Sequence, residues 1–174
     1  MNIPYFDEVI STTITCDTCS YRFNDILITS QKKPIEYKFI ISKVEDLNIR
    51  VIRSSTATID IPELGIKIEP TTMAEAFVSN IEGVLVRVEG AIEQASRFTD
   101  DSYKKKRAKK LIQQIDQLKK GEGKATIIIK DPMGNSGILS PEAETRELEP
   151  AEIDPISTGV TFIDITKKDS LLDN

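Results

Sequence analysis

The chain has 174 residues, 39% of them hydrophobic and 29% charged, which suits one folded domain or one domain with a small appendage. Its net charge of -5 argues against a general nucleic-acid binder, and the absence of histidine excludes Ser-His and Cys-His nucleophile systems and imidazole metal sites. No apolar run reaches the roughly 18 residues of a membrane span, and no secretory signal pattern opens the chain. We therefore expect a cytoplasmic protein.

Residues 1–30 are predicted to form a small N-terminal unit. A strand over residues 8–15 leads into Cys16 and Cys19, and a second strand covers about residues 22–29. Two strands joined by a CxxC turn indicate half of a zinc ribbon. A structural zinc site takes four ligands, however, and these are the only two cysteines. An inert or redox-active thiol pair is the alternative, although a redox CxxC is expected at the start of a helix.

The main domain is predicted to span residues 31–150 and to begin with short strands. Apolar alternation and the turn residues between the segments predict these strands at 35–41, 49–53, 56–61 and 65–69.

A helical period then replaces the alternation over residues 72–121. Thr72 and Glu75 form a capping box, which predicts the start of the first helix at this point. Acidic residues near Asp100 favour the start of the second helix. The apolar stripes of the two helices comprise Phe77, Ile81, Val84, Leu85, Val88, Ile92 and Ala95, and then Ala108, Leu111, Ile112, Ile115 and Leu118.

The short connection between these helices predicts an antiparallel hairpin, with arms on the order of 30 Å long. The two stripes are expected to be its packing seam; the alternative is that one apolar edge contacts a partner. Strands resume over residues 124–130 and 145–149, with a turn at 131–137 between them. The alternative for this turn is a loop that contacts a partner. Residues 151–174 are predicted to hold a last strand, at 161–165, and a tail.

The charged residues allow two interpretations. The basic run in the second helix comprises Lys104, Lys105, Lys106, Arg107, Lys109 and Lys110. It is either a solvated helix face or a contact for an acidic partner or RNA, and protein is favoured because aromatic residues do not interleave with it.

Asp46, Asp60 and Glu63 invite an acid–base interpretation, but no nucleophile or histidine accompanies them, so we expect no enzymatic turnover.

Several segments, in order from residue 3 to about residue 149, resemble the ZPR1 zinc-finger family. The segments 3–10 and 16–22 are similar to the family's lead-in strand and second CxxC, and 46–64 to its central signature. The segments 82–85 and 131–136 are similar to its helix segment and late turn. The matching positions singled out as candidate family residues are Asp46, Arg50, Pro62, Glu63, Glu82, Gly83, Asp131, Gly134, Asn135 and Ser136.

This resemblance implies a mainly β fold with α: a partial zinc ribbon, then a domain like the double-stranded β-helix that carries an inserted antiparallel helical hairpin. It implies a single-module, archaeal-type member that binds zinc through Cys16 and Cys19. It further implies a partner, translation elongation factor one-alpha, whose folding or assembly the protein assists. Residues expected to contact this partner are Tyr21, Arg22, Lys104, Lys105, Arg107 and Lys109.

Two departures from the family pattern affect the finger. The family uses two CxxC pairs, and we expect the first pair to lie upstream of Met1 in the reading frame or to have been lost. A zinc site shared between two chains, in a homodimer, is the alternative. Ser20 stands where the family has glycine, and we expect it to adopt a positive φ at a cost of roughly 1 kcal/mol.

Two other functions remain open from the residues alone. One is a β-barrel protein or enzyme that binds a small ligand, since barrels of this kind host such sites. The other is a nucleic-acid-associated zinc-ribbon protein.

Overall fold

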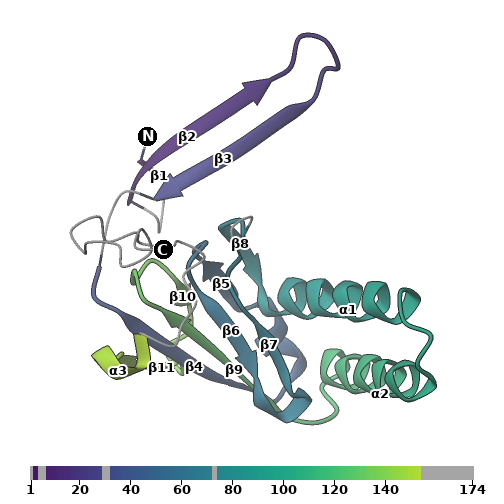
Figure 1. Ribbon diagram of the computed structural model, residues 1–174. Coiled ribbons are helices and arrows are strands. Elements are labelled where there is room, and N and C mark those ends of the chain that lie inside the picture. The colour runs from purple at the N-terminus through teal and green to yellow at the C-terminus, as the bar shows by residue number, and fades with distance from the viewer. Residues whose placement is uncertain (1, 4–6, 29–31, 72–73, 154–174) are drawn as a thin grey trace, which may run out of the picture.

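The computed structural model describes residues 2–3, 7–28, 32–71 and 74–153. Antiparallel strands form three sheets, and a pair of long helices extends from them (Figure 1). Within the described ranges, none of the helices is both long enough and apolar enough to cross a membrane.

The N-terminal sheet is a long hairpin. It contains β1 (Asn2–Ile3), β2 (Asp7–Thr15) and β3 (Arg22–Ile28) in the order β1-β2-β3. The β2–β3 register runs from Val9 opposite Ile28 to Thr15 opposite Arg22, so the CxxC turn closes the ladder. The hairpin extends away from the other sheets with this turn at its far end (Figure 1). The predicted pair of strands around the cysteines is confirmed.

The other two sheets form the body of the protein. The larger has the order β11-β4-β9-β6-β7, with bounds β4 (Ile35–Ile41), β6 (Thr58–Ile61), β7 (Ile66–Ile68), β9 (Ala125–Asp131) and β11 (Glu144–Glu147). The smaller has the order β10-β5-β8, with bounds β5 (Arg50–Arg53), β8 (Phe77–Asn80) and β10 (Gly137–Ile138). Two short 3-10 turns, η1 (Val44–Asn48) and η2 (Pro62–Leu64), connect strands.

One apolar core joins the sheets and the helices. In β9 every second side chain is buried, as the alternation in the sequence predicts. Ile127 and Ile129 of this strand are fully buried, as are Ile81 and Leu85 of the first helix and Ile115 of the second. The helical hairpin is therefore anchored in the body rather than attached to its surface.

The helical hairpin consists of α1 (Ile81–Arg97) and α2 (Ser102–Lys119). The Asp101 carboxylate caps α2 by accepting hydrogen bonds from two backbone N–H groups of its first turn. Lys119 of α2 forms an ion pair with Glu89 of α1, and both side chains are largely buried. The predicted stripes face the seam and the core: Val84, Leu85, Val88, Ala108, Ile115 and Leu118 are all buried.

The predicted start of the first helix is wrong. Glu75 lies before the helix in irregular structure, Thr72 is outside the described residues, and Phe77 belongs to strand β8. The helix begins at Ile81, where the Asn80 carboxamide oxygen accepts a hydrogen bond from the Gly83 N–H at 2.8 Å. Pairing with β5 on one side gives residues 77–80 ladder hydrogen bonds, and this outweighs the local capping signal.

The C-terminal part also differs from the sequence-based expectation. The strand predicted at 145–149 covers Glu144–Glu147, and a short helix, α3 (Pro150–Ile153), follows it, where no element was predicted. The last strand predicted at residues 161–165 lies outside the described residues.

Candidate functional site

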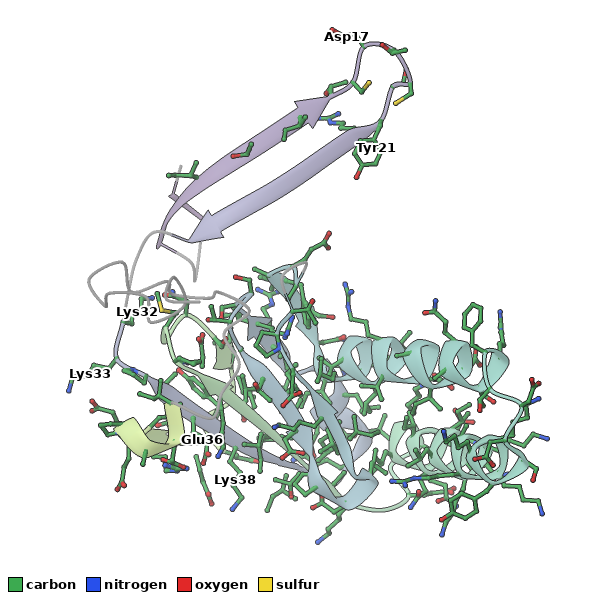
Figure 2. The ribbon with its side chains drawn as sticks, viewed as in Figure 1. Asp17, Tyr21, Lys32, Lys33, Glu36 and Lys38 are labelled. Carbon is green, nitrogen blue, oxygen red and sulfur yellow. The ribbon has the colours of Figure 1, made fainter. Side chains whose placement is uncertain are left out.

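The hairpin of β2 and β3 is the finger of this protein. The CxxC turn at its tip has a defined backbone conformation. The Cys16 N–H donates to the Tyr21 carbonyl at 2.8 Å, and the Ser20 N–H donates to the Cys16 carbonyl at 2.9 Å. Ser20 has a φ of 58°, the only positive value at a non-glycine residue in the described part of the chain. The positive φ expected at this position is confirmed. Asp17 and Tyr21 lie at this end of the hairpin, away from the sheets (Figure 2).

The turn also favours a thiolate at Cys16. Backbone N–H groups of Cys19 and Thr18 hydrogen-bond the Cys16 sulfur, and the Cys19 thiol adds a further bond, so the pKa of Cys16 lies below its usual value. Hydrogen bonds to the charged form stabilise it, and the thiolate is the form that binds metals. Both cysteines are free, and Cys19 is exposed.

These features fit two of the four ligand positions of a structural zinc ion. Cys16 and Cys19 would hold the metal, with their sulfurs preorganised by the turn. Across the described residues, no cluster of three or more cysteine, aspartate or glutamate side chains is placed to complete the site. A complete four-ligand site would need two further ligands besides these sulfurs. When bound, the zinc supplies a cross-link between the strands of the finger.

Two signature segments that are far apart in the sequence meet at one buried carboxylate. Asp131 is fully buried at the end of β9. Its oxygens accept hydrogen bonds from the Ser54, Thr56 and Ser136 hydroxyls and the Met133 and Asn135 N–H groups, all at 2.7–2.9 Å. The segment 131–136 is therefore a tight turn anchored to the central signature.

Gly134 shows why this turn needs a glycine. Its φ is 70°, and a Cβ atom there would lie 2.2 Å from the Lys33 carbonyl oxygen. The turn thus packs against the segment that leads from the finger into the body. Gly83 differs, since a Cβ atom there would lie 2.2 Å from the Ser79 hydroxyl oxygen, a side-chain atom that would have to move.

The remaining signature residues also have structural contacts. The buried Asp46 carboxylate accepts from the Ser42 and Lys43 N–H groups at 2.8 and 3.1 Å. Glu63 accepts from both the N–H and the hydroxyl of Thr126, which ties η2 to β9.

Three further signature positions lie at defined points of the fold. The Arg50 carbonyl accepts from Leu139, Pro62 opens η2, and Glu82 occupies the first turn of α1, where a negative charge is favourable.

The predicted basic surface lies on the outer face of α2. Lys104, Lys105 and Lys109 are exposed, while Ala108 between them points into the body. Arg107 differs from the lysines because its guanidinium comes within 3.6 Å of the Cβ position of Gly65, at the β6–β7 connection. It is exposed but lies against the body. The structure does not bring the finger residues Tyr21 and Arg22 together with this basic surface (Figures 1 and 2).

Sequence reasoning missed two aromatic residues at the tip of the helical hairpin. Phe98 ends α1 and is 83% exposed, and Tyr103 lies in the first turn of α2 and is 72% exposed. Tyr103 directly precedes the lysines of the basic surface. Their positions in the sequence, off the apolar stripes and at the connection between the helices, could have identified Phe98 and Tyr103 as exposed.

The comparisons with known proteins decide the family. Residues 45–153 match the ZPR1 jelly-roll domain, and residues 1–33 match the ZPR1 zinc-finger domain. This chain belongs to the ZPR1 family. The jelly-roll match agrees with the antiparallel sheets of the body, and the predicted β-helix-like domain is confirmed.

Archaeal relatives cover most of the chain. It is 40% identical over 165 residues to an uncharacterised ZPR1-like protein of Methanocaldococcus jannaschii, which covers 95% of this chain and 83% of that protein. A ZPR1-like protein of Pyrococcus horikoshii is 41% identical over 160 residues, with coverages of 90% and 72%. A single module is consistent with these matches.

Eukaryotic relatives are longer. The zinc finger chaperone zpr1 of Schizosaccharomyces pombe is 30% identical over 142 residues, which cover 78% of this chain but 31% of that protein. The family and these relatives support a zinc-finger protein-binding role, and the zinc-finger family implies zinc binding.

Proposed function

We propose that this protein is a zinc-finger module that binds translation elongation factor one-alpha and assists its folding or assembly in the cytoplasm, without catalytic turnover. The chaperone relative in fission yeast supports the general class of function. The choice of partner follows from the family resemblance, and two exposed surfaces of the molecule support a docking role.

The observation that carries this proposal is the tip of the helical hairpin. Phe98 and Tyr103 are the most exposed large apolar side chains among the described residues. Aromatic residues of this kind are enriched among the residues that dominate binding energies at interfaces. The adjoining lysines of α2 give this tip a positive charge on an otherwise acidic chain, which steers an acidic surface towards it.

The finger provides a second contact. Tyr21 is 62% exposed directly after the CxxC turn, and Arg22 beside it is also exposed. Zinc would hold this tip in one conformation and so reduce the entropy lost when a partner binds. A partner that touches both tips would be held by two separate surfaces.

The roles of the buried carboxylates support binding rather than turnover. Asp131 and Asp46 are occupied by hydrogen bonds that hold turns, and the sequence contains no histidine to act beside them. A confirmed substrate turnover that is lost on mutating a residue of the body would contradict this part of the proposal.

The test is a calorimetric titration of zinc-loaded protein against the cognate elongation factor with GDP, with GTP and without nucleotide. Replacing Phe98 and Tyr103 by alanine should weaken binding by about tenfold or more. Leu139→Ala, which truncates an exposed apolar residue elsewhere, is the matched control.

The charge contribution is tested separately. Reversing Lys105 and Lys109 to glutamate should slow association, and this effect should shrink as salt is raised. Lys124→Glu is the control for a change of charge outside α2. Arg107 is left in place because it lies against the body. Absence of binding by the zinc-loaded protein in every nucleotide state would overturn the choice of partner.

A further inference from the structure

A groove of about 520 Å³ lies beside α1, and neither Phe98, Tyr103 nor the finger residues line it. Strands β7 and β8 contribute to its walls through Ile66, Lys67, Ile68 and Phe77. The apolar side chains along its floor include Ile59, Ile66, Ile68, Val84, Val88 and Ile92.

Both of these strands end their sheets. β7 is the last strand in the order β11-β4-β9-β6-β7, and β8 is the last in the order β10-β5-β8. Within the described residues, each pairs with a neighbour on one side alone. An edge strand presents backbone N–H and C=O groups that can pair with another chain. Here those edges border an apolar groove that can receive the side chains of an added strand.

Two guanidinium groups stand at one end of the groove. Arg53 is 5% exposed and donates to the carbonyl oxygens of Ala57 and Glu75 at 3.2 and 3.3 Å. Burial lowers the pKa of Arg53, and the negative charge of Asp131 opposes this shift. Arg87 is exposed and lies 4.7 Å from the centre of the Phe77 ring. Among the described residues, neither arginine forms an ion pair with a carboxylate.

We propose that this groove binds an extended peptide segment of a partner protein that combines alternating apolar side chains with an acidic residue. The segment adds a strand along the free edge of β7, its apolar side chains enter the groove, and its carboxylate pairs with Arg87 and Arg53. This site is independent of the identity of the partner that the two tips bind.

The free strand edges beside the groove favour a peptide over a small carboxylic acid as its ligand. A free fatty acid or similar ligand would use the apolar floor and the arginines but would leave the edges of β7 and β8 unpaired. A peptide uses all three features, because its backbone supplies the hydrogen bonds, its apolar side chains fill alternate positions and its acidic side chain neutralises the arginines.

The probe is a fluorescein-labelled, end-capped peptide of sequence Thr-Ile-Thr-Val-Thr-Glu-Thr, titrated against the full chain by fluorescence anisotropy. In an extended strand its Ile, Val and Glu side chains lie on one face, so all three can enter the groove that the arginines line. A second peptide replaces the glutamate by lysine, and a third carries N-methyl groups at alternate residues on the edge expected to face β7. The first should bind, and each of the other two should bind about tenfold or more weakly.

Substitutions in the groove provide the reciprocal test. Ala91→Trp places a large side chain in the groove from the exposed part of α1, and Gln94→Trp places the same side chain on α1 outside the groove. The first variant should abolish binding of the peptide and the second should not. Arg87→Glu should weaken binding, and the lysine-containing peptide should then bind better than the acidic one. Unchanged melting temperatures would show that each variant remains folded.

Three results would overturn the proposal. One is equal binding by the wild-type protein and the Ala91→Trp variant. Another is equal binding of the N-methylated peptide, since strand addition requires those N–H groups. The third is complete competition by octanoate at or below the concentration of the peptide, which would identify a site for small carboxylic acids. None of these results bears on binding to the elongation factor, which is measured at the other surfaces.

Discussion

The finger and the body of this protein maintain their structures in different ways. In the body, Ile59, Ile61 and Ile81 are completely buried, and the Asp131 carboxylate is surrounded by donors. In the finger, none of the side chains whose exposure is described is buried, and Ile10 and Ile14 are more than half exposed. The body therefore carries its own stabilising contacts by burial. A finger that binds zinc, as its family implies, would gain stability from metal ligation instead.

The largest effect is expected from removing the acceptor at the centre of the body. Asp131→Ala leaves buried hydroxyl and N–H groups without their acceptor, and each such group costs about 1–3 kcal/mol. We expect a loss of at least about 3 kcal/mol in urea unfolding, with a smaller loss for Asp131→Asn, which keeps one acceptor oxygen. Asp100→Ala, in the exposed connection between the helices, is the control. A loss below about 1 kcal/mol for Asp131→Ala would show that water replaces the carboxylate.

A smaller effect, confined to the finger, is expected at Ser20. Its φ of 58° is strained for serine, and Ser20→Gly relieves roughly 1 kcal/mol. The variant should therefore bind Zn²⁺ or Co²⁺ about fivefold more tightly, as measured by competition with a chelator. The midpoint of body unfolding should not change. Equal metal affinity in the two proteins would show that the turn adopts this conformation without strain.

Acid should affect α3 within a defined pH range. Hydrogen bonds from Arg146 lower the pKa of Glu152 from 4.5 to about 2. The carboxylate is therefore fully stabilising above pH 4.5, and its contribution is lost as the pH falls towards 2. Glu152→Gln should flatten the dependence of the unfolding midpoint on pH in this range alone, and salt should reduce the difference. An unchanged acid profile would show that the pair has no net effect.

The smallest effect on the body is expected from removing both thiols. Replacing Cys16 and Cys19 by serine should abolish zinc binding by the finger, measured by elemental analysis, because serine does not supply thiolate ligands. The body should keep its stability to within about 0.5 kcal/mol, since these residues lie outside its core. Loss of body stability together with the metal would contradict the separation of the two regions.

The sequence predicted the local structure of the finger more completely than that of the body. The CxxC turn depends on a few consecutive residues and followed from local chemistry. The positive φ at Ser20 was expected because the family that the chain resembles has glycine at this position. The predicted start of the first helix failed because Thr72 and Glu75 form a local capping pattern, while pairing with β5 decides the conformation of residues 77–80. The exposed Phe98 and Tyr103 were missed because exposure depends on what packs nearby.

By itself, the sequence determined the elements whose causes are local: the alternation of residues 125–131, the apolar stripe of residues 102–119 and the CxxC turn. Only the tertiary structure decided that Ser54, Thr56 and Ser136 meet at Asp131, and that the free edges of β7 and β8 border one apolar groove beside two arginines. The physical reason is the range of the interactions. Turn and helix propensities act between residues a few positions apart, whereas strand pairing and burial depend on segments brought together by the whole fold.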